Sequence, residues 1–208
     1  MLFLEQNVYR PVGNRIDRFY DARGTRTCGV PWVIVDSGLR YTCGYEDFTK
    51  RYRTLVTEAM STPAEAEIEG WFLRTDNDLR VHVEVTNRTG RTLGFANWPT
   101  INVLVYEEAR VYQTRRFVRA AAQLDVDGLI PDGMSTAADI ELLDVYAKDW
   151  AKAHVIALFD YRPEPTESRF VSAQAVEVTE GVPPTPSPVP TFASDTPKVF
   201  LPLAIGPR

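Results

Sequence analysis

Cysteine and histidine are scarce in this sequence, which has two of each among 208 residues. Zinc sites in proteins use three or four such ligands close together. His82 lies on the polar face of one predicted strand and His154 begins another, and neither has a cysteine nearby. We therefore expect no metal ion and no cofactor.

Runs of one charge sign and long apolar runs are also missing. The 23 cationic residues are scattered and the net charge is −5, which argues against a nucleic-acid binder. No apolar run approaches the roughly 18 residues of a membrane-spanning helix, so no transmembrane segment is expected. The start, Met1-Leu2-Phe3-Leu4, is too short for the core of a signal peptide, and we expect the chain to begin inside a longer secreted precursor.

Catalytic motifs are missing as well. The chain has no glycine-rich phosphate loop, no Gly-x-Ser-x-Gly elbow and no Ser/His/Asp set. Glu107 and Glu108 are adjacent at the end of a predicted strand, so their carboxylates are expected to point to opposite faces, which does not suit shared acid-base chemistry. Asp125-Val126-Asp127-Gly128 is similar to the start of a calcium loop, but Leu129 stands where a ligand is expected, so a polar turn is predicted. Asn87-Arg88-Thr89 is a glycosylation sequon.

Strand and helix patterns alternate in the first part of the chain. Residues 2–5 form a short apolar run typical of a buried strand, and residues 11–24 carry apolar side chains at helical spacing. Strands at 31–36 and 39–43, joined by a Ser-Gly turn, predict a hairpin, and an amphipathic helix is predicted at 48–60. The expected order is strand, helix, strand, strand, helix.

This order resembles the thioredoxin family, and the resemblance covers residues 1–62. The family carries Cys-x-x-Cys where this sequence reads Tyr9-Arg10-Pro11-Val12, so the nucleophilic thiols are missing. Val30-Pro31 matches the position of the family's cis-proline. Because the fold grips extended peptides beside this loop, the resemblance implies ligand contacts from Tyr9, Arg10, Pro31 and Trp32.

The two cysteines flank the predicted hairpin. Trp32 is expected roughly opposite Cys43, which leaves Cys28 a few residues further along. A disulfide between Cys28 and Cys43 would close a loop of about 15 residues and contribute ~3 kcal/mol. Such a bond indicates an oxidising compartment. Two unpaired thiols and a redox-active pair are the alternatives.

In residues 63–179 the apolar residues recur with a period of two, which is typical of β-strands. The second predicted strand alternates cleanly, with Val81, Val83 and Val85 expected inward. Seven short strands separated by turn-rich joints suggest an antiparallel immunoglobulin-like β-sandwich. The predicted strands are 65–74, 79–87, 101–107, 116–122, 137–143, 154–161 and 170–178.

Residues 180–208 are rich in proline, which favours an extended, disordered spacer outside any packed core. An apolar segment begins at Val199 and ends at Ile205. This arrangement resembles the C-terminal stalk and attachment signal of surface proteins in some filamentous bacteria, which implies attachment to the cell envelope. The alternative is a tail that folds back as one more strand at the edge of the sheet.

The domain order resembles the Omp28-type surface proteins of bacteria. The predicted fold class is α+β, with a thioredoxin-like α/β domain at 1–62, an all-β immunoglobulin-like sandwich at 63–179 and a tail at 180–208. The resulting hypothesis is a non-catalytic extracellular or cell-surface protein that is structural or binds an unknown protein or peptide ligand. Two alternatives stay open: an extracellular thiol-disulfide oxidoreductase that uses Cys28 and Cys43, and the C-terminal part of a larger secreted enzyme.

Overall fold

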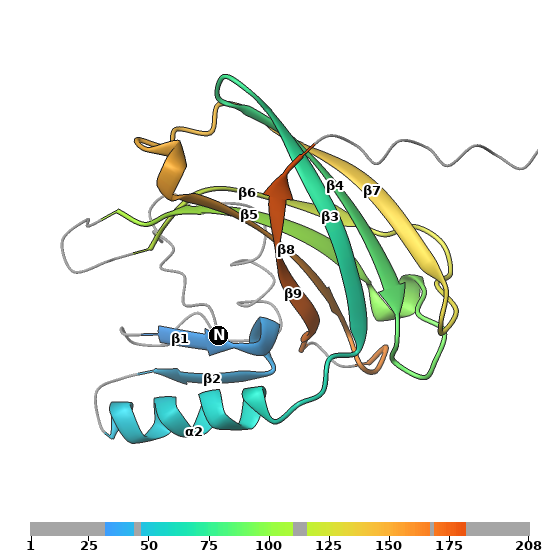
Figure 1. Ribbon diagram of the computed structural model, residues 1–208. Coiled ribbons are helices and arrows are strands. Elements are labelled where there is room, and N and C mark those ends of the chain that lie inside the picture. Colours follow the sequence, from blue (N-terminus) through green and yellow to red (C-terminus); the bar gives the residue numbers. More distant parts are fainter. Residues whose placement is uncertain (1–31, 44–46, 110–115, 167–168, 182–208) are drawn as a thin grey trace, which may run out of the picture.

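A seven-stranded β-sheet dominates the computed structural model, which describes residues 32–43, 47–109, 116–166 and 169–181 (Figure 1). The first part of this range contains β1 (Trp32–Val35), η1 (Asp36–Gly38), β2 (Arg40–Cys43) and α2 (Phe48–Met60). The sheet follows, with β3 (Ala66–Thr75), β4 (Asp78–Asn87), β5 (Thr100–Glu107), β6 (Phe117–Asp125), β7 (Ser135–Leu142), β8 (Ala153–Tyr161) and β9 (Val171–Glu180). Two short 3-10 helices, η2 (Phe95–Asn97) and η3 (Trp150–Lys152), lie in its loops.

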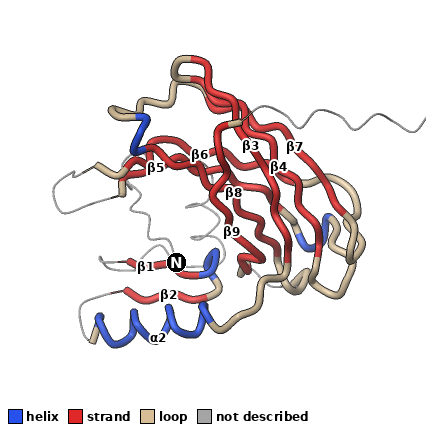
Figure 2. The backbone as a smooth tube through the Cα atoms, viewed as in Figure 1, coloured by secondary structure: helices blue, strands red, loops and turns tan. Residues whose placement is uncertain are grey.

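The strands of the sheet follow the order β6-β5-β8-β9-β3-β4-β7. All neighbours pair antiparallel except β3 and β9, which run parallel and pair at Trp71↔Thr179 and Phe72↔Glu180. This short contact joins a β6-β5-β8-β9 half to a β3-β4-β7 half. The sheet curls at the junction, so that one face of each half turns toward the other (Figures 1 and 2).

The main apolar core lies between the two halves. In β4, Leu79, Val81, Val83 and Val85 are buried and alternate with more exposed residues, as expected of a strand with one covered face. Phe159 of β8 packs in the same core from the opposite half. Full burial of each such side chain contributes about 1.5–3 kcal/mol before the entropic cost of ordering the chain.

Strand β8 is buried on both faces. Phe159 belongs to the main core, whereas Ile156 and Leu158 form a second apolar cluster with Leu104 and Tyr106 of β5. Burial on both faces explains why β8 reads as a nearly continuous apolar run instead of an alternating one.

The hairpin of β1 and β2 packs beside the start of β9. Its backbone register places Trp32 opposite Cys43, which confirms the predicted hairpin register. Asp36 accepts a 2.9 Å hydrogen bond from the backbone N–H of Ser172 and forms an ion pair with Arg40. Burial of the Asp36 carboxyl outweighs these two partners and raises its pKa. The turn of the hairpin is therefore anchored to the sheet.

The predicted α+β fold class is wrong. The described residues contain one α-helix, α2, and the strands before it form only a two-stranded sheet, which gives little thioredoxin-like α/β character. All seven strands predicted after residue 63 are present, but one curled sheet joins them, in place of an immunoglobulin-like sandwich of separate sheets. Periodicity identifies strands from local sequence, whereas the pairing of β3 with β9 depends on residues far apart in the chain.

Several predictions concern residues outside the described part. Tyr9, Arg10, Pro31, Cys28 and the tail after residue 181 belong to this group. The disulfide between Cys28 and Cys43 therefore stays a prediction. Among the helices that the structure describes, none has the length and apolar character to cross a membrane.

Candidate functional site

Two loops at one end of the sheet are held together by hydrogen bonds. The loop between β4 and β5 meets the loop between β6 and β7 where Leu93 and Ile130 exchange backbone bonds of 3.0 and 2.8 Å. Gly90 donates its N–H to a carboxylate oxygen of Asp132 at 3.0 Å. These bonds give the loop pair a defined shape, although it contains little regular secondary structure.

Asn87 organises this loop pair. Its buried amide nitrogen donates to the carbonyl oxygens of Arg91 and Ile130, both at 2.7 Å. Its amide oxygen accepts bonds from the N–H and the hydroxyl of Thr89, at 2.9 and 2.8 Å. The asparagine of the sequon is thus fully occupied in the fold, and its side chain is closed to a glycosyl group.

The loop pair presents two large apolar side chains to solvent, Phe95 and Leu129, which we name the apolar tip. Phe95 is 94% exposed and Leu129 is 76% exposed. A Cβ atom at Gly94 would lie 2.7 Å from Cδ2 of Leu129, so this glycine allows Leu129 to lie over the other loop. The tip is therefore a joint feature of both loops.

Several aspartates lie close to Leu129 in the sequence. Asp127 and Asp132 lie on the same loop as Leu129. Asp125 ends β6 directly before this loop and accepts a 2.9 Å bond from Gln123. Gly128 has φ 98°, a conformation that favours glycine, as suits the predicted polar turn. Within the described ranges, no group of three or more His, Cys, Asp or Glu side chains is placed to hold a metal ion.

Two arginines near the apolar tip form ion pairs with glutamates. Arg88 pairs with Glu67 at 2.8 Å, and Arg91 pairs with Glu164 at 3.4 Å. The hydrogen bond with Arg88 lowers the pKa of the Glu67 carboxyl. The surroundings of the tip are therefore acidic on balance.

At the end of the loop between β4 and β5, an arginine packs between two aromatic rings. The guanidinium of Arg162 lies 4.6 Å from the ring centre of Trp98 and 5.2 Å from that of Phe170. Trp98 has φ 46°, which is unusual for a large residue. Asn97 accepts a 2.6 Å bond from the N–H of Arg162.

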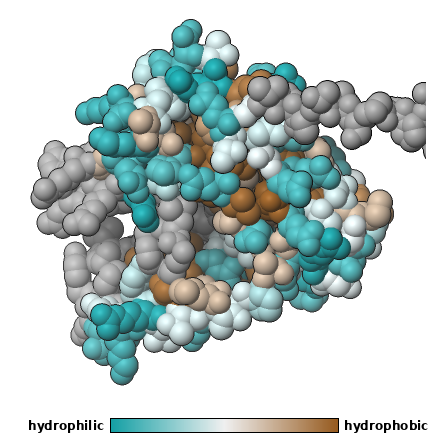
Figure 3. Space-filling model, viewed as in Figure 1, coloured by the Kyte–Doolittle hydropathy of each residue, from teal (hydrophilic) through white to brown (hydrophobic). Residues whose placement is uncertain are grey.

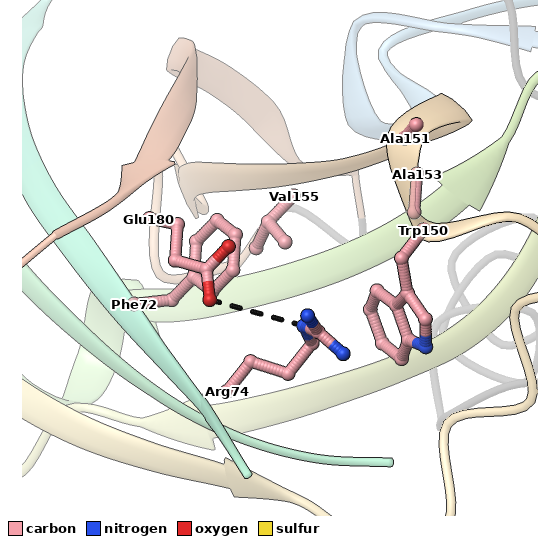
Figure 4. A pocket seen from close by; sticks show the side chains of 7 residues that line it. All are labelled: Phe72, Arg74, Trp150, Ala151, Ala153, Val155 and Glu180. Carbon is pink, nitrogen blue, oxygen red and sulfur yellow. Dashed lines mark ion pairs between the residues drawn. The ribbon is translucent and has the colours of Figure 1, made fainter. Parts of the chain in front are cut away.

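A recess lies at the other end of the sheet, between β3, β8 and η3 (Figure 4). Its volume is about 250 Å³. The lining residues are Phe72, Arg74, Trp150, Ala151, Ala153, Val155 and Glu180. In the space-filling view, apolar residues reach the surface near the centre of the coloured part, whereas much of the rest of the coloured surface is polar (Figure 3).

Arg74 crosses the mouth of this recess. It extends between the carboxylate of Glu180 and the indole ring of Trp150 (Figure 4), at 3.8 Å from the former and 4.9 Å from the ring centre of the latter. Its side chain is 33% exposed and that of Glu180 is 55% exposed. An ion pair this long and this exposed contributes little to stability.

A buried ion pair holds Trp150 in place. Glu107 accepts backbone N–H bonds from Lys148 at 3.2 Å and Asp149 at 2.8 Å, and it pairs with Arg119. Burial acts to raise the pKa of Glu107, but the two N–H donors and the guanidinium together lower it. The loop before η3 is thereby fixed to β5 and β6.

His82 and Asp139 form a pair that invites a catalytic interpretation. Nδ1 of His82 lies 3.0 Å from the Asp139 carboxylate, which also accepts a 3.0 Å bond from Arg80. The His82 ring stacks on Trp71 at 5.2 Å between ring centres, and an indole has no nucleophilic atom to activate. The arrangement is an exposed surface network across β3, β4 and β7.

The ligand residues expected from the sequence are not tested by this geometry. Tyr9, Arg10 and Pro31 lie outside the described residues, and only the backbone of Trp32 is described. Sequence reasoning missed the apolar tip and the recess. A Gly-Phe pair in a polar loop, and Arg74 two positions after Phe72 in one strand, were the available signals.

Comparisons with known proteins give no family for this chain: no protein-family model matches it, and no curated protein matches it. Among solved structures, a domain of the outer membrane lipoprotein Omp28 from Porphyromonas gingivalis is similar to this chain. Its sequence is 17% identical, the match covers 56% of this chain and 88% of that chain, and the TM-score is 0.33. The sporulation control protein Spo0M from Bacillus subtilis is 9% identical, with 57% and 50% covered and a TM-score of 0.35. A DUF3823 family protein from Bacteroides ovatus is 10% identical, with 55% of each chain covered and a TM-score of 0.31.

Proposed function

We propose that this chain is a non-catalytic binding protein of the cell surface or extracellular space, and that its apolar tip enters an apolar pocket on a protein partner. The observation that carries this proposal is the exposure of Phe95 and Leu129 on a hydrogen-bonded loop pair. Two large apolar side chains held out in water are a cost to an isolated protein. Burial in a partner would remove that cost.

The loop pair is suited to binding because it is ordered before the partner arrives. Asn87 and the bridge between Leu93 and Ile130 fix both loops, so little loop entropy is lost on association. Full burial of a Phe or Leu side chain contributes about 1.5–3 kcal/mol. The pair therefore has the properties of a small hot spot.

The charge around the tip favours one kind of partner. Asp125, Asp127 and Asp132 supply negative charge, while Arg88 and Arg91 are paired with glutamates. A pocket with a lysine or arginine rim complements this charge, whereas a second copy of the chain or an anionic membrane repels it. We infer a protein partner with a basic rim around its apolar pocket.

The position of the tip suits display on a stalk. β3 begins at Ala66, opposite Asn87 at the tip end, and β9 runs parallel to β3. Glu180 thus ends β9 at the end of the sheet away from the tip. If residues 180–208 are a stalk that attaches to the cell envelope between Val199 and Ile205, the tip faces outward, with residues 1–62 and 63–179 as the displayed domains.

Photo-crosslinking on the producing cells tests this proposal. We expect p-benzoylphenylalanine at position 95 or 129 to capture one protein, whereas the same probe at Leu143 or Tyr146, each 68% exposed at the other end of the sheet, captures none. The Phe95→Ser, Leu129→Ser double variant should weaken binding to the captured protein by about 100-fold, or ~3 kcal/mol. Equal capture at all four positions would overturn the proposal.

A further inference from the structure

We propose that the recess is a second binding site, which takes an extended peptide segment as an added strand on β3. The segment places one apolar side chain in the recess and a carboxylate against Arg74. This proposal is independent of the apolar tip, because the two features lie at opposite ends of the sheet and share no residue.

The first support is the direction of the β3 backbone. Gly181 donates its N–H to the carbonyl oxygen of Phe72 at 3.1 Å, so Phe72 turns its backbone groups toward β9. Because backbone direction alternates along a strand, Arg74 turns its N–H and C=O to the same side. β3 continues to Thr75, beyond the last residue of β9.

The second support is the sequence that follows β9. Phe72 pairs with Glu180, so a continued parallel ladder would pair Arg74 with residue 182 and require an N–H from residue 183. Residue 183 is proline, which has no N–H to donate. The ladder formed by β9 therefore cannot satisfy the carbonyl oxygen of Arg74, and a donor from an added strand can.

The size and lining of the recess define the side chain that enters it. Phe72, Val155 and Trp150 supply apolar walls, and Ala153 leaves room between them (Figure 4). The volume of about 250 Å³ is below the range of about 300–1,000 Å³ typical of small-molecule sites. One leucine-sized or phenylalanine-sized side chain suits it better than a drug-sized molecule.

The positive charge of Arg74 at the mouth of the recess favours an acidic residue in the bound peptide. The guanidinium of Arg74 has five N–H donors; one of them, on Nη1, reaches the carbonyl oxygen of Asp76 at 3.3 Å, and at 3.8 Å Glu180 lies beyond hydrogen-bond distance. A ligand carboxylate can approach more closely and displace Glu180. Because alternate side chains of a strand share a face, the expected ligand carries Asp or Glu two positions from its apolar residue.

A random heptapeptide library displayed on phage and selected on the full-length chain tests this inference. We expect enrichment of peptides with a large apolar residue and an Asp or Glu two positions away. Ala153→Trp fills the recess and should weaken binding of the selected peptides at least about tenfold. Ala151→Trp is a second filling variant at an exposed position, for use if Ala153→Trp does not fold.

Two further variants test the role of charge. Arg74→Gln should weaken binding of the selected peptides but should not change binding of analogues that carry Asn or Gln in place of the Asp or Glu. Glu180→Gln should strengthen binding of the selected peptides. Leu143→Ser is the control and should have no effect.

Three results would overturn the inference. The first is a selection that yields no enriched motif. The second is a set of selected peptides whose binding is the same to the wild type and to both filling variants. The third is enrichment of sequences that repeat residues 182–208, which would identify the chain's own tail as the occupant.

Discussion

The side-chain amide of Asn87 donates a 2.7 Å hydrogen bond to the carbonyl oxygen of Ile130, 43 positions further along the chain. Asn87 ends β4, whereas Ile130 lies in the loop that carries Leu129. One buried side chain therefore joins the two loops of the apolar tip. The order of this surface depends on a polar residue inside the protein.

Asn87→Ala should lower the free energy of unfolding by about 2–3 kcal/mol, because it removes a buried amide together with the hydrogen bonds that this amide makes to the carbonyl oxygens of Arg91 and Ile130 and to Thr89. Urea denaturation measures the change. Asn77→Ala, at an exposed turn position, is the control and should change stability by less than about 0.5 kcal/mol. A similar loss in both variants would contradict the role assigned to Asn87.

Glu107→Gln should destabilise the protein at neutral pH by about 3 kcal/mol, because it leaves Arg119 without its buried anionic partner. The wild-type carboxyl has a pKa below its ordinary value of 4.5, so its contribution is complete well above pH 4.5 and is lost as pH falls through the lowered value. Stability of the variant should therefore fall less on acidification. Denaturation curves between neutral and acidic pH, with Glu108→Gln as the control, measure this difference.

Tyr161→Phe should make the protein more resistant to alkali. Burial, followed by the hydrogen bond to Glu65, raises the pKa of Tyr161 to about 12 from the ordinary value of 10.0. The folded state retains this proton above pH 10 while the unfolded state releases it, so stability falls as pH rises from 10 to 12. Denaturation curves across this window should be flatter for Tyr161→Phe, and Tyr146→Phe, at an exposed position, should behave as wild type.

Gly94→Ala should displace Leu129 with little loss of stability. The new Cβ would meet the far end of the Leu129 side chain at 2.7 Å, and a flexible side chain can move aside for less than about 1 kcal/mol. We expect shifted methyl NMR signals for Leu129 and weaker binding by the tip. Gly90→Ala is the contrasting variant: its φ is 75° and nothing lies within 4 Å of the new Cβ, so it should cost stability and leave the Leu129 signals unchanged.

The sequence predicts local elements well where the pattern is strong. The alternation of Val81, Val83 and Val85 identifies β4, and the Ser-Gly turn gives the register that places Trp32 opposite Cys43. These features depend on neighbours in the chain and on turn geometry, both of which can be read from a short stretch.

The arrangement of these elements could not be predicted in the same way. The pairing of Phe72 with Glu180 turns two groups of strands into one curled sheet, and no local pattern encodes it. Phe95 is a large apolar residue of the type usually found in a core, yet it is exposed on a loop that the bridge between Leu93 and Ile130 joins to the β6–β7 loop. The candidate sites were missed because each depends on contacts between distant segments.

The place of β9 in the sheet also determines how the protein responds to mechanical force. β9 pairs with β8 on one side and with β3 on the other, and the chain continues to the proline-rich tail directly after Gly181. A pull along the axis of β9 loads the hydrogen bonds to both neighbours in shear and at the same time. Strands loaded in this direction cannot open one bond after another from an end, and the sheet would hold under tension until these bonds give way together.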